Sequence, residues 1–120
     1  MDSRPKTIIC DIDGTLISHH GNAYQQLMRD PEILPGVLEK FEQWDRKGYN
    51  IILITGRREN WREKTEKQLS GIGIFYDQLI MGVGGGPRIL INDLKPNKKF
   101  KTALAYNLVR NEGMENLEEI

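Results

Sequence analysis

The apolar run at residues 49–54 constrains the fold of this chain more than any other stretch. It lies between Gly48 and the polar triplet Thr55, Gly56 and Arg57. An apolar strand of this kind is typical of a parallel sheet that is covered by helices on both faces. The run therefore predicts an α/β fold.

The rest of the chain alternates between strand-like and helix-like segments. Four short strands separated by helices imply a three-layer, Rossmann-like α/β domain with a mostly parallel sheet, and 120 residues suffice for one such domain spanning 1–120. A loop or small hairpin is expected at 17–22, and the acidic tail at 111–120 is expected to be loosely held. The predicted strands are 7–11, 49–54, 79–81 and 88–91, and the predicted helices are 35–47, 60–70 and 98–110.

The composition excludes several classes of protein. The 17 basic and 17 acidic residues balance, so no net charge draws the chain toward nucleic acid or anionic lipid. Cys10 is the only cysteine, which excludes an internal disulfide and fits a reducing compartment. No apolar run approaches membrane-spanning length, and residues 1–6 lead directly into a strand without the apolar core of a signal peptide. We therefore expect a cytoplasmic protein.

Polar side chains follow three of the predicted strands. Asp11 and Asp13 end the first, Thr55 follows the second, and Asp93 follows the fourth. The C-terminal ends of parallel strands meet at one edge of a sheet, where open α/β sheets bind ligands. Asp11 and Asp13 start on the same side of the chain, and neighbouring buried carboxylates require a cation or a shared proton. This edge is therefore a candidate metal site.

These residues, taken in order, resemble the motifs of the haloacid dehalogenase (HAD) superfamily. Its first motif, Asp-x-Asp-x-Thr, is matched by Asp11, Asp13 and Thr15. Its second motif, a Thr or Ser after an apolar strand, is matched by Thr55, and its fourth, an acidic residue after another strand, by Asp93. The resemblance covers nearly the whole chain and implies a HAD-like fold.

The resemblance also implies a reaction and a role for each residue. Asp11 would be the nucleophile that forms an aspartyl-phosphate, and Asp13 the general acid and then the general base. Mg²⁺ would bind the Asp11 carboxylate, the Asp13 backbone carbonyl and the Asp93 carboxylate. Thr55 and the neighbouring backbone N–H groups, including that of Gly56, would bind the phosphoryl oxygens.

Two positions depart from the family pattern. The third motif is a basic residue, for which Arg88 is the favoured candidate, with Lys64 and Lys67 as alternatives on the preceding helix. In the fourth motif, Asn92 stands where many relatives have a second acid. A weaker metal site is one expected consequence.

The spacing of the motifs leaves no room for a cap domain. Only roughly forty residues separate Asp13 from Thr55, and a helix and a strand occupy most of them. Relatives without a cap act on large substrates such as phosphoproteins or nucleic-acid ends, or use a neighbouring subunit of a homo-oligomer as a lid. His19 and His20 lie where such relatives have a small flap. A phosphorylated small molecule is the favoured substrate.

An arginine cluster follows Thr55. Arg57, Arg58 and Arg62 form either a basic rim for a second phosphate or a solvated helix face paired with glutamates, and the Thr-Gly-Arg-Arg start also resembles the phosphatase part of polynucleotide kinase-phosphatases. The sequence therefore predicts a Mg²⁺-dependent phosphomonoester hydrolase. The alternatives are a polynucleotide-end phosphatase, or a catalytically weak protein that binds a phosphorylated ligand or a protein partner.

Overall fold

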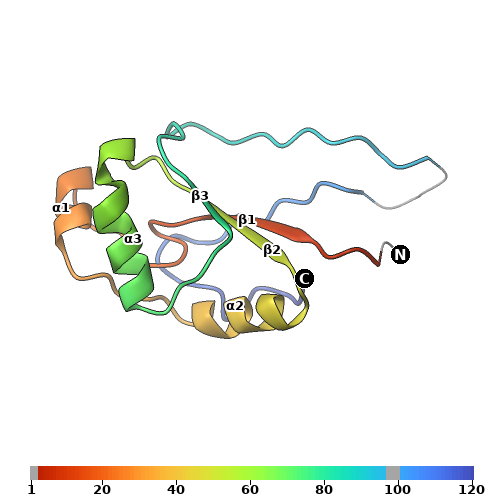
Figure 1. Ribbon diagram of the computed structural model, residues 1–120, viewed down its shortest axis with the longest axis horizontal. Coiled ribbons are helices and arrows are strands. Elements are labelled where there is room, and N and C mark those ends of the chain that lie inside the picture. The colour runs from red at the N-terminus through yellow and green to blue at the C-terminus, as the bar shows by residue number, and fades with distance from the viewer. Residues whose placement is uncertain (1–2, 97–100) are drawn as a thin grey trace.

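The computed structural model, which describes residues 3–96 and 101–120, is built on a parallel sheet of three strands (Figure 1). The strands are β1 (Thr7–Asp11), β2 (Asn50–Ile54) and β3 (Gln78–Ile80), in the order β1-β2-β3. The register pairs Asp11 with Ile54, and Ile54 with Ile80, so the three strands end at the same edge. The predicted α/β fold with a parallel sheet is confirmed.

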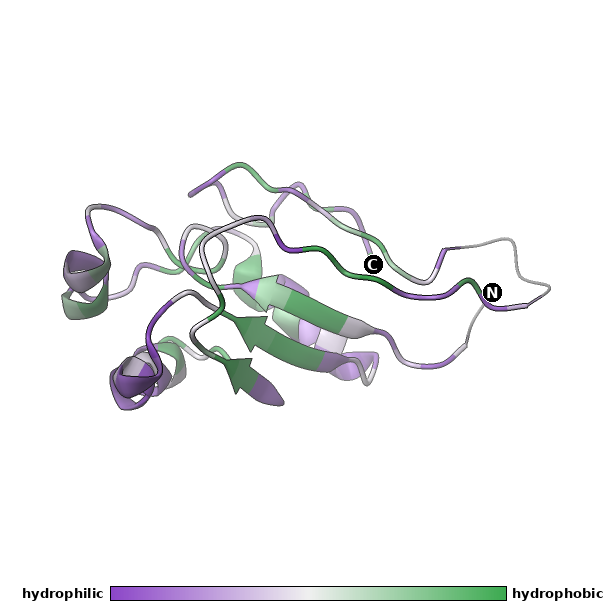
Figure 2. Cartoon of the chain, turned by 90° about the horizontal axis from the view of Figure 1, so that it is seen from above, coloured by the Kyte–Doolittle hydropathy of each residue, from purple (hydrophilic) through white to green (hydrophobic). Residues whose placement is uncertain are grey.

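One face of the sheet forms the core together with helix α2 (Val37–Arg46). Cys10, Leu53 and Leu79 are paired across the three strands, lie on this face and are buried. The apolar positions of α2 recur at helical spacing, so Phe41 and Trp44 pack against them in the same buried cluster. Figure 2 shows the apolar character concentrated along the strands.

The opposite face of the sheet is less completely covered. Ile52 and Ile54 of β2 are half-buried, whereas Ile9 of β1 and Ile80 of β3 are 47% and 44% exposed. No cap domain is present among the described residues. The chain between Asp13 and β2 holds only the loop at 17–22, which we call the flap, one short helix and α2.

Two further helices lie near the C-terminal ends of the strands. The short helix α1 (Ala23–Met28) precedes α2, and a 3-10 turn, η1 (Glu59–Trp61), leads into α3 (Arg62–Gly71). Figure 1 shows α1 and α3 at the same end of the molecule. Helix α1 was not predicted, because its six residues are too few to show an apolar period.

The prediction of a fourth strand at 88–91 and a last helix at 98–110 is wrong for the described residues. Residues 88–91 and 101–110 have no regular structure, and 98–100 lie outside the described ranges. Ile89 and Ile91 are 84% and 86% exposed, so within 3–96 and 101–120 the apolar run has neither a partner strand nor a core to cover it. An apolar run forms a strand only when another strand supplies its hydrogen bonds. Figure 1 shows residues 84–96 running away from the sheet.

The prediction that the tail at 111–120 is loosely held is also wrong. Met114 is 2% exposed and donates its backbone N–H to Pro35 over 2.8 Å. Lys47 forms an ion pair with Glu119 at 2.9 Å, and the Tyr49 hydroxyl donates to the Ile120 carbonyl. The tail is therefore part of the packed body beside α2.

Among the described residues, no helix has both the length and the apolar character that crossing a membrane requires.

Candidate active site

The adjacent ends of β1 and β2 bring together the predicted site residues of the first two motifs. Asp11 is the last residue of β1 and lies opposite Ile54, the last residue of β2, so Asp13 and Thr55 follow at the same edge. The chain then turns sharply, because the Leu16 N–H donates to the Ile12 carbonyl at 2.8 Å.

Gly14 makes this turn possible. Its φ is +86°, a left-handed conformation that residues with a side chain rarely adopt, and a Cβ there would lie 3.1 Å from the side chain of Arg110. The Gly14 N–H donates to the Ile17 carbonyl, which closes the loop that presents Asp13. The turn thereby sets the direction of the second aspartate.

Asp13 is held by a buried arginine. Arg57 Nε donates to Asp13 Oδ2 over 3.0 Å, and Arg57 Nη2 donates to Oδ1 over 2.8 Å, so the two residues form a two-point pair. The arginine side chain is 5% exposed and that of Asp13 19% exposed. Because both hydrogen bonds are largely shielded from water, they fix the plane of the Asp13 carboxylate.

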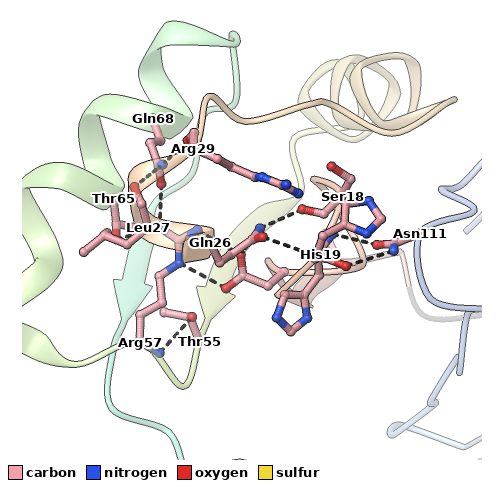
Figure 3. A network of polar contacts seen from close by, with 12 residues as sticks. Ser18, His19, Gln26, Leu27, Arg29, Thr55, Arg57, Thr65, Gln68 and Asn111 are labelled. Atoms are coloured by element: carbon pink, nitrogen blue, oxygen red, sulfur yellow. Dashed lines mark hydrogen bonds and ion pairs between the residues drawn. The ribbon is translucent and has the colours of Figure 1, made fainter. Parts of the chain in front are cut away.

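The Arg57 guanidinium is itself fixed by α3. Its Nη1 donates to Thr65 Oγ1 at 3.0 Å and to Gln68 Oε1 at 2.6 Å. Gln68 in turn donates to the carbonyls of Leu27 and Arg29 at the end of α1. This chain of contacts, drawn in Figure 3, connects both helices to the second aspartate.

Gln26 of α1 is the second polar side chain that donates to the Asp13 carboxylate. Its Nε2 donates to Asp13 Oδ1 over 2.9 Å, and the side chain is almost completely buried. The flap that precedes α1 is held on its other side by Asn111, whose side chain exchanges two hydrogen bonds with the backbone of His19. The Asn111 N–H also donates to the Gly14 carbonyl. The flap backbone is therefore hydrogen-bonded on both sides, next to the turn that carries Asp13.

Asp11 has a more open environment than Asp13. Its side chain is 38% exposed, and Arg88 Nη1 lies 3.2 Å from its Oδ1. A carboxylate that is reachable from solvent and has one cation beside it suits a nucleophile that meets an anionic group. The neighbouring Cys10 is not a competing nucleophile, because burial raises the pKa of its thiol to about 12.

Thr55 and Gly56 form a tight connection at the end of β2. Thr55 is buried, and its hydroxyl oxygen accepts from the Arg57 N–H at 3.1 Å, so its own hydrogen can still be donated. A Cβ at Gly56 would lie 3.1 Å from the Val83 carbonyl oxygen, which explains a small residue there. The role of both residues in phosphate binding stays a prediction.

Asp93 does not join the two aspartates in this structure. Its carboxylate pairs with Lys95 at 3.6 Å, and its carbonyl accepts from the Thr102 hydroxyl. Within 3–96 and 101–120, no three acidic, histidine or cysteine side chains gather as a metal site would require. Since 88–91 is not a strand beside β1, Asp93 is not placed at the shared edge. Asp11 and the Asp13 carbonyl supply oxygen donors suited to Mg²⁺, but the third donor is elsewhere.

The structure separates the arginines that the sequence grouped together. Arg62 pairs with Glu59 and Glu66 on the helix surface, and the hydrogen bond from Arg62 holds the pKa of the Glu59 carboxyl below its usual value. Arg62 therefore matches the second alternative, a solvated helix face paired with glutamates. Arg57 fits neither alternative, because it points inward to Asp13.

Sequence reasoning missed the roles of Arg57 and Gln26. A local signal for α1 was nevertheless present: the Asn22 side chain accepts from the Gln25 N–H, while Gln25 accepts from the Asn22 N–H, which is a capping box. No comparable signal marks Arg57, because its partner Asp13 lies 44 residues away.

Comparisons with known proteins identify the family of this chain. Residues 5–110 match the family model described as the polynucleotide kinase PNKP phosphatase domain. A chain in a structure of a Pnkp1/Rnl/Hen1 complex is 34% identical, with a TM-score of 0.58 over 71% of this chain. A second structure, of the Pnkp1/Rnl/Hen1 RNA repair complex, gives 35% identity and the same TM-score over 72% of this chain.

This chain spans only 30% and 28% of the length of those two matched chains. A crystal structure of a protein from Vibrio cholerae, 20% identical with a TM-score of 0.53 over 76% of this chain and 84% of that one, shares the fold. The family match covers most of the sequence, from before β1 to Arg110. The chain belongs to the family of polynucleotide kinase phosphatase domains, a group of HAD-like phosphoric monoester hydrolases.

Proposed function

We propose that this chain hydrolyses phosphomonoesters through an aspartyl-phosphate on Asp11. The observation that carries the proposal is the contrast between the two aspartates. The Asp11 carboxylate is open to solvent beside Arg88, whereas the Asp13 carboxylate is held in one orientation by Arg57. A nucleophile must be reachable, and a proton donor must be fixed.

Each proton and bond has a place in the proposed reaction. An Asp11 carboxylate oxygen attacks phosphorus, the ester P–O bond breaks, and Asp13 gives its proton to the departing oxygen. Water then attacks the phosphorus of the aspartyl-phosphate and gives a proton to Asp13. The bond between phosphorus and the Asp11 oxygen breaks, which releases inorganic phosphate and restores the Asp11 carboxylate. Arg88, 3.2 Å from Asp11, offsets negative charge as the phosphoryl group arrives.

The cofactor that we propose is Mg²⁺. The Asp11 carboxylate and the Asp13 carbonyl would hold it, with Asp93 as the third protein ligand, and the ion would supply positive charge for the phosphoryl oxygens. The oxygen chemistry of Asp11 and Asp13 supports this assignment. The position of Asp93 beside Lys95 does not, so its contribution needs a separate test.

The substrate class that we propose is a phosphorylated nucleic-acid end rather than the small molecule favoured by the sequence. The family is that of polynucleotide kinase phosphatase domains, and one similar chain belongs to an RNA repair complex. The lack of a cap among the described residues leaves room for a polymer at the strand ends. Arg110, whose side chain lies beside Gly14, is exposed and suits a polyanion.

The test is hydrolysis of a panel of phosphomonoesters by the purified protein, with Mg²⁺ and with a chelator. The panel contains a 3′-phosphorylated oligonucleotide, a nucleotide, a sugar phosphate and a phosphopeptide, and Asp11→Asn is the control. We expect metal-dependent phosphate release that is greatest for the oligonucleotide and that falls at least about 1,000-fold in the Asp11→Asn variant. Tight binding of these esters without turnover would instead favour the phospholigand-binding alternative.

A further inference from the structure

We infer that Gln26 is a positioning residue that determines which oxygen of Asp13 exchanges the proton with the substrate. This inference rests on the proposed function, because it concerns the general acid of that reaction. It adds a residue of α1, outside the four motifs of the superfamily, to the groups that control the reaction.

The side-chain amide of Gln26 makes three hydrogen bonds. Its Nε2 donates to Asp13 Oδ1 over 2.9 Å and to the Ser18 carbonyl over 2.6 Å, and its Oε1 accepts from the His20 N–H at 3.2 Å. The orientation of the amide is fixed by chemistry, since a carboxylate and a carbonyl can only accept and a backbone N–H can only donate. With an exposed fraction of 3%, water does not compete for these contacts.

Gln26 makes the two oxygens of Asp13 unequal. Arg57 gives one hydrogen bond to each oxygen, so the arginine alone leaves them alike. Gln26 adds a second donor to Oδ1 only. Oδ2 therefore keeps a free acceptor direction, and we assign it the proton that passes to the departing oxygen.

The same amide connects Asp13 to the flap. It contacts the backbone of Ser18 and His20, while Asn111 holds His19 between them. Any displacement of the flap backbone by a bound substrate would be transmitted through Gln26 to Oδ1 of Asp13. Proton transfer is thereby linked to the segment that lies beside the catalytic turn.

A leaving-group comparison tests the inference. An alkyl phosphate needs its departing alkoxide protonated, whereas p-nitrophenyl phosphate releases a stable anion that needs little help. For Gln26→Met we expect kcat/KM to fall by about 10-fold or more on an alkyl monoester and by less than about 3-fold on the aryl ester. Gln25→Met, the same change at the exposed neighbouring residue whose side chain accepts from the Asn22 backbone N–H, should alter neither.

Two further variants separate positioning from general loss of structure. Gln26→Leu removes the same hydrogen bonds with a shorter apolar side chain and adds no charge beside Asp13, so it should give the same leaving-group pattern even if Gln26→Met folds poorly. In an Asp13→Asn background, Gln26→Met should cause no further loss on the alkyl ester, because the two residues act as one unit.

The outcomes distinguish this inference from the proposed function. Equal losses on both esters, or additive losses in the double variant, would overturn the role of Gln26 while leaving the phosphatase assignment in place. No hydrolysis of either ester by the unaltered protein would overturn the proposed function, and the inference with it.

Discussion

The two halves of the candidate site differ in how the chain builds them. The half around Asp13 joins β1, β2, α1 and α3 through Arg57, Gln68 and Gln26, all of which are buried. The half around Asp11 takes Arg88 from the segment after β3, which also carries Asp93 and whose residues 84–94 are exposed and have no regular structure. A site is fixed where hydrogen-bonded strands and buried helix side chains meet, and stays open where a single extended segment supplies the residues.

The largest effect is expected for Arg57→Lys, which disturbs the half of the site around Asp13. In Arg57→Lys the charge remains, but an ammonium cannot make the two-point pair with Asp13 and also reach Thr65 and Gln68. We expect kcat on an alkyl phosphate to fall about 100-fold, because the proton donor is no longer held in place. Steady-state kinetics measure the loss.

Arg58→Lys is the matched control, because Arg58 is the exposed neighbour outside the network. It should retain full activity toward the same alkyl phosphate. An Arg57→Lys variant that is as active as Arg58→Lys would show that the buried pair does not position Asp13 for catalysis.

The open half is tested at Asp93. If this carboxylate completes the Mg²⁺ site, Asp93→Asn should raise the Mg²⁺ concentration for half-maximal activity by about 10-fold, because one negatively charged ligand is lost. Lys95→Met removes only the ion-pair partner of Asp93 and should leave that concentration unchanged or lower it. An unchanged Mg²⁺ requirement in Asp93→Asn would exclude Asp93 from the metal site.

The smallest effect on turnover is expected at Asn111, which holds the flap from the side opposite Gln26. Asn111 has a φ of +65° and exchanges two hydrogen bonds with His19. Asn111→Ala should lower the free energy of unfolding by about 2 kcal/mol, since it loses both contacts and strains the backbone. Asn111→Gly loses the contacts without the strain. Its free energy of unfolding in urea should therefore lie between those of the unaltered protein and of Asn111→Ala. Equal stability of all three proteins would mean that Asn111 does not hold the flap.

The packed part of the fold was predictable because its pattern is local. The apolar run of β2 and the helical spacing of Phe41 and Trp44 in α2 each report burial directly. Gly48, which follows that helix, has a left-handed φ of +73°, the conformation that a glycine commonly adopts just after a helix. By contrast, the apolar run at 88–91 predicted a strand that is absent here, because pairing depends on a neighbour that sequence pattern alone cannot place.

The site was predictable only to the level of strand ends. The positions of Asp11, Asp13 and Thr55 follow from where apolar runs stop, and the parallel sheet brings them to one edge. The direction of Arg57 does not follow, since its contacts with Thr65 and Asp13 depend on how α3 packs beside the sheet. Arginines after a strand are usually solvated, so the buried one was grouped with its neighbours.

The central claim, that Asp11 carries the phosphoryl group while Asp13 moves the proton, is tested most directly by trapping the covalent intermediate. Asp13→Asn should still accept a phosphoryl group from p-nitrophenyl phosphate, whose leaving group needs little protonation, but should be slow to hydrolyse the product. Rapid quenching and mass spectrometry should show the mass of one phosphoryl group on the peptide that contains Asp11, and none when Asp11→Asn is added. A phosphoryl group on another residue, or one that persists in the Asp11→Asn background, would contradict the account.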